Sequence, residues 1–264
     1  MQNLPVIISI SNQKGGVGKT TTAVNLGASL ASKNKRVLVI DLDPQGNASS
    51  GLGVFKEDVQ ESIYHVIIGE RSVDQVTRET EIPGLSLVPA STELAGAEVE
   101  LVNTFAREMR LKGALEQTRE QYDFVLIDCP PSLGLLTVNS LTVADAVLIP
   151  LQCEYYALEG LSHLLHTVEL VRGSLNPQLD VMGILLTMFD GRTSLAHQVE
   201  DEVRSHFPDK VFKTVIPRNV RLSEAPSHGR PALLYDVASR GSQGYLAMAE
   251  EILSHDGRPV APAA

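Results

Sequence analysis

The chain has 264 residues, and its 22 Lys and Arg residues against 32 Asp and Glu residues give a formal net charge of −10. A chain of this length can bury a core without disulfide staples, as one large domain or two small ones. Hydrophobic residues make up 43% and charged residues 20% of the chain, which excludes a disordered or fibrous protein. Aromatic residues reach only 5% and Trp is absent, which disfavours a surface built on aromatic stacking.

The sequence lacks the patterns of secreted and membrane proteins. Cys129 and Cys153 are too few for a disulfide framework, and we expect both to be reduced, buried side chains. No run of about 18 apolar residues is present to span a bilayer. The N-terminus has neither the basic flank nor the apolar run of a signal peptide. We therefore expect a cytoplasmic protein.

Apolar runs rich in Val, Ile and Leu predict β-strands at residues 6–10, 37–40, 124–127, 146–151 and 181–188. The runs do not alternate with polar residues, which is typical of strands buried on both faces of a parallel sheet. Helical patterns lie between them, at residues 20–31, 105–119, 158–171 and 195–205. This alternation predicts an α/β fold with a mostly parallel twisted sheet flanked by helices on both faces.

The domain organisation is predicted to be simple. The sequence contains no repeat, no low-complexity block and no linker that would divide the chain. We expect one domain over residues 1–254. The Pro- and Ala-rich stretch at 255–264 is expected to be a flexible C-terminal tail.

A glycine-rich segment at residues 9–22 joins the first predicted strand to the first predicted helix and reads SISNQKGGVGKTTT. Gly15, Gly16 and Gly18 permit positive φ and let backbone N–H groups approach phosphate oxygens, with Val17 between them. The following helix adds the positive end of its dipole. The segment therefore predicts a phosphate loop, and the chain a P-loop nucleotide hydrolase.

The residues after the glycines have the types that a phosphate loop needs. Lys19 is expected to reach the β- and γ-phosphates, and the Thr20 hydroxyl to ligate Mg²⁺. Thr21 can contact the α-phosphate. Gln13 stands where the general motif has Gly, so the match to that motif is imperfect, and Lys14 follows as a second lysine.

Carboxylates follow two of the predicted strands. Asp41 and Asp43 follow closely after the run at 37–40, and Asp128 directly follows the run at 124–127. The carboxyl ends of parallel strands face the ligand crevice, so Asp43 is expected to orient water or contact the Mg²⁺ shell, with Asp41 behind it. Asp128 is expected to hold Mg²⁺ through water. The loop at 44–52 is glycine-rich enough to respond to the γ-phosphate as a switch.

Five long strings of this chain resemble the ParA/Soj chromosome-partitioning ATPases, of the deviant Walker A class. They read SNQKGGVGKTT, DLDPQGN, DCPPSLG, QCEYYALEG and IPRNVRLSEAP, at residues 11–21, 41–47, 128–134, 152–160 and 216–226. Because the sequence begins at its first predicted strand, it is similar to the short chromosomal type. That type lacks the N-terminal helix-turn-helix domain of some plasmid relatives.

The resemblance implies a nucleotide-driven cycle with ATP and Mg²⁺. ATP-bound subunits would form a sandwich homodimer and bind double-stranded DNA without sequence preference, on the nucleoid. A ParB-like centromere-binding partner would stimulate slow ATP hydrolysis, with residues 100–119 one candidate for its docking surface. Lys14 would act across the dimer on the other subunit's nucleotide, and Pro217 and Asn219 would contact the adenine end.

A DNA-binding face can be tested against charge. Residues 204–230 contain six Lys and Arg residues and two acids, a local balance of +4 in a chain of −10. Family positions point to Arg192 and Arg221 as phosphate contacts, with Lys213 and Arg218 as helpers. Dimerisation would double this patch and make DNA binding sensitive to salt.

Other members of this fold class suggest rival functions. A MinD-like membrane switch needs a basic amphipathic C-terminal helix, whereas residues 245–254 contain two Glu and no Lys or Arg. The nitrogenase iron protein needs cysteine ligands at a dimer axis, and Cys129 is wrongly placed for that role. A cobyrinic-acid-type ligase would need a pocket motif that we do not find. A scaffold that does not hydrolyse ATP is disfavoured by the presence of both lysines and of Asp43 and Asp128.

Overall fold

The computed structural model describes residues 6–154 and 157–254. The expected tail at 255–264 lies outside these residues. Within them the chain forms one seven-stranded sheet in the order β3-β4-β2-β5-β1-β6-β7. All neighbouring strands are parallel except β3, which pairs antiparallel to β4 at one edge. The strands are β1 (Val6–Ile10), β2 (Val37–Asp41), β3 (Arg78–Glu79), β4 (Leu85–Val88), β5 (Phe124–Asp128), β6 (Ala146–Gln152) and β7 (Asp180–Thr187).

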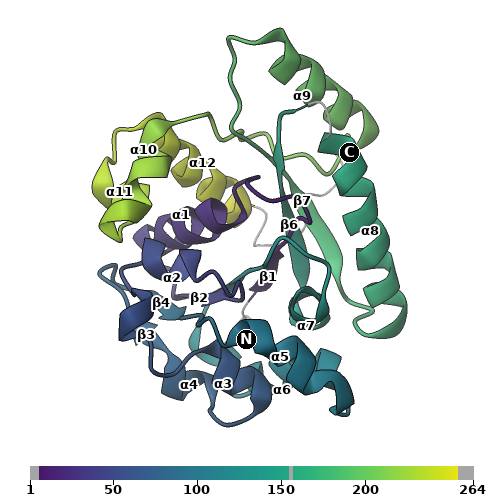
Figure 1. The fold of residues 1–264 in the computed structure, drawn as a ribbon. Coiled ribbons are helices and arrows are strands. Elements are labelled where there is room, and N and C mark those ends of the chain that lie inside the picture. The colour runs from purple at the N-terminus through teal and green to yellow at the C-terminus, as the bar shows by residue number, and fades with distance from the viewer. Residues whose placement is uncertain (1–5, 155–156, 255–264) are drawn as a thin grey trace.

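Helices cover both faces of this sheet (Figure 1). The α-helices are α1 (Lys19–Ser32), α2 (Asn47–Gly51), α3 (Ile63–Ile68), α4 (Val73–Val76), α5 (Leu94–Glu100), α6 (Arg110–Leu115), α7 (Leu135–Val143), α8 (Ala157–Ser174), α9 (Ser194–His206), α10 (Val220–Glu224), α11 (Ala232–Tyr235) and α12 (Arg240–Ser254). Short 3₁₀ turns are η1 (Lys56–Asp58), η2 (Leu101–Asn103), η3 (Arg107–Met109), η4 (Arg119–Gln121) and η5 (Ala225–His228).

Two apolar cores follow from the alternation of side chains along the buried strands. Ile7 and Leu38 pack in the core shared with α3, α5, α6, α7 and α8. Their chain neighbours Ile8 and Val39 point the other way, into the core shared with α1 and α12. Each strand is therefore apolar on both faces, which is why the sequence shows continuous apolar runs.

The predicted fold class is confirmed, and the five predicted strands are present with bounds that differ by at most one residue. The short strands β3 and β4 were not predicted, because runs of two and four residues give too weak a signal. The helix predicted at 105–119 is wrong over much of its length, since only Arg110–Leu115 is α-helical. Ala106 has φ of +51°, a left-handed conformation that a continuous right-handed helix excludes.

Candidate functional site

The register of the parallel strands brings the sequence-predicted acids together. Asp41 at the end of β2 lies opposite Asp128 at the end of β5, and Asp128 lies opposite Ile10 at the end of β1. The glycine-rich loop leaves β1 at this same edge and enters α1. The carboxyl ends of the central strands thus form the floor of a crevice, as ligand sites in open α/β sheets do.

The loop after β1 has the backbone conformation of an anion cradle. Gly16 has φ of +74° and Gly18 has φ of +92°, and Gly18 caps the start of α1. No atom lies within 4 Å of a Cβ added at Gly15 or Gly16, so the loop has open space beside it. Val17 is buried, and its carbonyl accepts a hydrogen bond of 2.8 Å from the Thr187 hydroxyl of β7.

Lys19, the first residue of α1, is only 6% exposed. Its ammonium donates a hydrogen bond of 3.1 Å to the carbonyl of Lys14, so the side chain lies back across the loop. Burial lowers the pKa of Lys19, while the nearby carboxylates of Asp128 and Asp43 oppose that shift. A buried cation therefore lies near two carboxylates beside the glycine-rich loop, which suits contact with a bound polyphosphate.

Asp128 is a buried carboxylate without a hydrogen-bonded partner. Among the described residues no group makes a normal hydrogen bond to either of its oxygens, and the residue is fully buried. Burial and then Asp41 raise the pKa of Asp128 well above its usual range, while the Thr20 hydroxyl and Lys19 oppose this shift. Unpaired buried carboxylates are costly, so this site fits a cation as its missing partner.

The two acids after β2 differ in their surroundings. Asp41 is fully buried, and its Oδ2 accepts hydrogen bonds of 2.7 Å from both the backbone N–H and the hydroxyl of Ser49 in α2. Burial raises the pKa of Asp41 to about 6, although the bonds from Ser49 oppose this. Asp43 is 7% exposed and accepts a bond of 2.9 Å from the Gln45 amide. Asp41 therefore anchors the loop to α2, and Asp43 is the acid nearer to the crevice surface.

Lys14 extends toward β6 in this structure. Its ammonium lies 3.1 Å from Oε2 of Glu154, with both side chains partly exposed. The Lys14 amide donates to the side chain of Asn12, which in turn donates to the carbonyl of Pro150. Asn12 thus fixes the start of the loop against β6. Sequence analysis did not single out Asn12, although it lies inside the quoted string.

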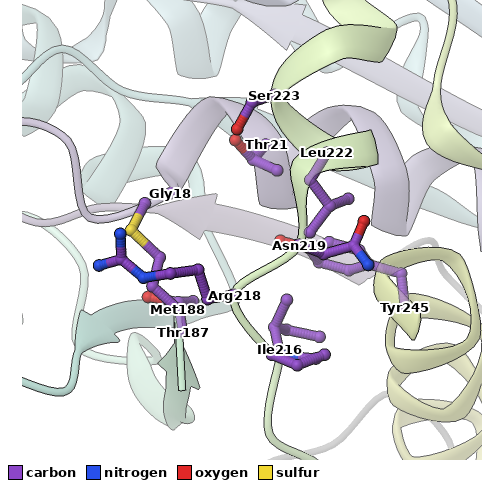
Figure 2. Close-up of a pocket in the computed structure, with 11 residues that line it drawn as sticks. Gly18, Thr21, Thr187, Met188, Ile216, Arg218, Asn219, Leu222, Ser223 and Tyr245 are labelled. Carbon is purple, nitrogen blue, oxygen red and sulfur yellow. The ribbon is translucent and has the colours of Figure 1, made fainter. Parts of the chain in front are cut away.

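A pocket of about 110 Å³ lies beside the loop at the start of α1. It brings together residues from α1, β7, α12 and the segment before α10, as Figure 2 shows. Pro217 and Asn219, expected at the adenine end, both line it near Thr21. The Phe189 amide donates to the Ile216 carbonyl, and the Arg218 amide donates to the Phe189 carbonyl. These bonds hold the segment against the end of β7. The lining includes Gly18, Thr187, Met188, Leu222, Ser223 and Tyr245.

Two lining residues were not anticipated from the sequence. The Tyr245 hydroxyl of α12 lies 3.1 Å from the Thr22 hydroxyl of α1, and both residues are buried. Met188 has φ of +51°, a strained conformation for a side chain of this size, directly after β7. Neither residue belongs to a recognisable motif, so only the three-dimensional packing reveals them.

The predicted DNA-binding residues are dispersed and exposed. Arg192 and Arg218 line one depression, together with Arg240. The guanidinium of Arg192 forms two hydrogen bonds with Asp190, of 2.8 and 2.7 Å. This pairing lowers the pKa of Asp190.

Arg221 is not among the residues that line that depression. Its guanidinium pairs with Glu224 at 2.7 Å and with Asp236 at 3.2 Å. Lys213 is exposed, and its backbone amide donates to Glu251 of α12.

The remaining predictions concern metals, cysteines and membranes. Cys129 and Cys153 are buried free thiols, as expected, and burial raises the pKa of Cys153 to about 12. Among the described residues, no three His, Cys, Asp or Glu side chains group as metal ligands. Within 6–154 and 157–254 no helix is long and apolar enough to cross a bilayer.

Three comparisons relate this chain to known proteins. The family model of an AAA domain matches residues 6–181. The chain is 59% identical to the sporulation initiation inhibitor protein Soj of Bacillus subtilis (strain 168), over 94% of this chain and 98% of that protein. It is 57% identical to the chromosome partitioning protein ParA of Myxococcus xanthus (strain DK1622), over 95% of this chain and 88% of that protein.

A solved structure shares the whole fold. It is a cobyrinic acid a,c-diamide synthase from Mycobacterium smegmatis with bound ATP analog and magnesium. That chain has a TM-score of 0.86 and 36% identity, and the match covers 99% of this chain and 100% of the other. The higher identities, over almost the full length, are to the Soj and ParA proteins. This chain therefore belongs to the ParA/Soj family of chromosome-partitioning proteins.

Proposed function

We propose that this protein is an ATP-dependent switch that drives the partitioning of a chromosome or plasmid. ATP binding would assemble a homodimer that binds double-stranded DNA without sequence preference. A ParB-like partner would then stimulate a slow ATPase reaction and release the protein from DNA. The observation that carries this proposal is that the buried Lys19 and three buried or nearly buried acids lie beside one open glycine-rich loop. The similarity to Soj and ParA supports partitioning as the process in which the switch acts.

The phosphate loop would bind the nucleotide through its backbone N–H groups and through lysine and threonine side chains. Lys19 would contact the β- and γ-phosphates, a role supported by its burial above Asp128. Thr21 would reach the α-phosphate, while Pro217 and Asn219 would line the adenine end of the neighbouring pocket. The loop residues proposed to surround the phosphates are Lys14, Gly15, Gly16, Val17, Gly18, Lys19 and Thr20.

Mg²⁺ would bind beside Thr20, Asp43 and Asp128. The unpartnered carboxylate of Asp128 supports this assignment, because a divalent cation offsets the cost of burying it. A bound metal supplies charge that stabilises a transferring phosphoryl group. Asp43 is the acid placed to orient water, since Asp41 is occupied with Ser49.

Lys14 is proposed to act on the nucleotide of the second subunit. It lies at the exposed side of the loop, and within the part of the chain that the structure describes its ammonium pairs with the partly exposed carboxylate of Glu154. An exposed pair of this kind is worth about 1 kcal/mol or less, so Lys14 can exchange Glu154 for a phosphate. Catalysis by such a cation resembles that of an arginine finger.

The DNA-binding face is proposed to comprise Arg192, Lys213, Arg218 and Arg221. One protomer offers few contacts, and a dimer offers twice as many, which couples DNA binding to ATP. Residues 1–254 would form the ATPase domain and 255–264 a tail. The protein would act in the cytoplasm at the nucleoid, without binding a membrane. The apolar side chains Tyr245, Met248 and Ile252 of α12 are buried, which supports the last point.

The decisive test is binding to a non-specific DNA duplex with ATP, with ADP and without nucleotide, each at two salt concentrations. We expect binding only with ATP, and weaker binding at the higher salt concentration. Asp43→Ala should bind DNA persistently, because hydrolysis is blocked. Lys14→Ala should bind nucleotide but fail to respond to the ParB-like partner. Binding that ignores the nucleotide, or none at all, would leave only a P-loop ATPase with another partner.

A small-molecule ligase is the rival that one solved structure suggests. It predicts ATP turnover that depends on an added carboxylic acid substrate. We expect turnover to depend instead on DNA and the ParB-like partner. Phosphate release measured with each addition separately distinguishes the two functions.

A further inference from the structure

The first residues of the glycine-rich loop are tied to the chain segment that joins β6 to α8. Asn12 holds the loop against β6 through the hydrogen bond described above. The Gln13 side-chain amide donates a bond of 3.3 Å to the Gly160 carbonyl in α8. The Lys14 ammonium adds the ion pair of 3.1 Å with Glu154. Three consecutive residues of the loop are therefore attached to this one segment.

Glu154 is held in turn by Gln152, the last residue of β6. The Gln152 side-chain amide donates a hydrogen bond to Oε1 of Glu154, while Oε2 faces the Lys14 ammonium. The Glu154 backbone amide also donates a bond of 2.8 Å to the Gln152 carbonyl. Both carboxylate oxygens are thus engaged, although the side chain is 47% exposed. Glu154 is a fixed partner for Lys14 and not a freely rotating surface acid.

The backbone of Lys14 is fixed as well, so only its side chain can change direction. The Lys14 amide donates to Asn12, and the Lys14 carbonyl accepts the bond of 3.1 Å from the Lys19 ammonium. The Lys14 side chain is 36% exposed, and the pair with Glu154 directs it toward β6 of its own subunit. A lysine held in this direction cannot at the same time extend into a neighbouring molecule.

We propose that Glu154 is a positioning residue that holds Lys14 on its own subunit until ATP-bound subunits pair. While it is held there, Lys14 is withheld from the nucleotide of the second subunit, which keeps hydrolysis slow. The polyphosphate of that nucleotide carries more negative charge than one carboxylate, so its approach draws Lys14 away from Glu154. The action of Lys14 across the dimer rests on the proposed function, whereas the pair with Glu154 does not.

The weakness of this ion pair suits a contact that has to open. A pair this exposed adds little to the stability of the fold, and salt weakens it further. Lys33 and Glu250 form a pair of the same type between the end of α1 and α12, and the Lys33 side chain is also 36% exposed. Neither residue belongs to the loop or to the segment between β6 and α8, so this second pair is a matched control.

The first test detects the pair itself and needs no hydrolysis. A carbodiimide joins an amine directly to a carboxylate that it touches, and mass spectrometry of the full chain measures the yield. We expect a link between Lys14 and Glu154 in the nucleotide-free protein, and a severalfold lower yield with a non-hydrolysable ATP analogue and Mg²⁺. The link between Lys33 and Glu250 should not change. No link at Lys14 in the free protein, or an equal yield with and without the analogue, would overturn the proposal.

The second test measures ATP hydrolysis by the protein alone. Glu154→Gln removes the carboxylate charge and should raise the rate about three- to fivefold, the range that an exposed pair allows. Glu250→Gln makes the same change of charge in the control pair and should leave the rate unchanged. In a Lys14→Ala background, Glu154→Gln should give no rise, because a purely structural effect of residue 154 would not need Lys14. Equal rates for Glu154→Gln and Glu250→Gln, or a rise without Lys14, would overturn the positioning role.

The failure of this proposal can be told apart from the failure of the proposed function. A Lys14→Ala variant that still responds fully to the ParB-like partner would refute the action of Lys14 across the dimer, and the proposed function with it. Loss of that response in Lys14→Ala, together with a wild-type rate in Glu154→Gln, would refute only the positioning role of Glu154.

Discussion

The two charged regions of this molecule are built in opposite ways. At the phosphate loop, Lys19 and Asp128 are buried. Lys19 begins α1 and Asp128 ends β5, so the backbone fixes their positions. In the basic region, which comprises the proposed DNA-binding residues Arg192, Lys213, Arg218 and Arg221, both Arg192 and Arg221 are on the surface and pair with acids of their own chain. In the first region, the Asp128 carboxylate is buried in a site of low dielectric constant and has no hydrogen-bonded partner. In the second region, the arginine charges are already compensated by carboxylates.

This difference separates what each region can do. A buried cation and an unpartnered carboxylate gain strongly from a ligand, because no solvent competes for them. A surface arginine with an intramolecular partner gains little from one phosphate, since it must first leave that partner. The loop is thus suited to bind one nucleotide tightly, whereas the arginines would bind DNA, as proposed, only as a set.

The largest expected effect is at Lys19. Lys19→Ala should reduce nucleotide affinity about 10- to 100-fold, because a charge-assisted contact of about 1.5–3 kcal/mol is removed in a buried site. Lys33→Ala, at the exposed end of α1, is the control and should bind as the wild type does. Titration with a fluorescent ATP analogue measures both. Similar affinities for the two variants would refute the contrast between the buried and the exposed regions.

The next largest effect is expected at Asp128, where a substitution should abolish activity and yet increase stability. Asp128→Asn should abolish Mg²⁺-dependent hydrolysis. It should also raise the free energy of unfolding in chelator by about 1–3 kcal/mol, because a buried, unpaired carboxylate is neutralised. The sign follows from the raised pKa of Asp128: ionisation favours the unfolded state as pH rises above the usual value of 3.8.

The control for this stabilisation is Asp123→Asn, because Asp123 pairs with Arg36 at the surface. This variant should not become more stable. Chemical denaturation at neutral pH measures all three proteins. A destabilised Asp128→Asn variant would mean that the carboxylate has a partner in the unliganded protein.

The same contrast explains how far the sequence could predict the structure. Lys19, Asp43 and Asp128 were identifiable because strand ends and glycine turns place them by local rules. The packing of Tyr245 against Thr22 depends on contacts between distant segments, which local patterns do not encode. The ion pairs of the basic residues could not be predicted from the sequence either, because the charge balance of residues 204–230 does not show which acid lies near each arginine.

A smaller effect is expected when one arginine is removed from the basic region. Arg221→Ala should weaken DNA binding of the ATP-bound protein and lower the salt slope by about one, while hydrolysis without DNA is kept. Arg172→Ala, another partly exposed arginine beside an acid, should leave both unchanged. Fluorescence anisotropy with a labelled duplex over a salt series measures this. Wild-type affinity in Arg221→Ala would exclude this residue from the DNA-binding face.

The smallest expected effect is a gain in DNA affinity rather than a loss. Asp190 holds Arg192 through two short hydrogen bonds, so it competes with any phosphate for that guanidinium. Asp190→Asn keeps an acceptor for the Arg192 amide but removes the negative charge, and it should raise DNA affinity two- to fivefold, in line with a surface pair of about 0.5–1 kcal/mol. Glu202→Gln, on the exposed side of α9, changes the net charge equally and is the control. If both variants gain affinity to the same degree, general charge would explain the result. If only Asp190→Asn gains, the basic region is limited by its own ion pairs, and DNA binding is a competition that the protein itself sets.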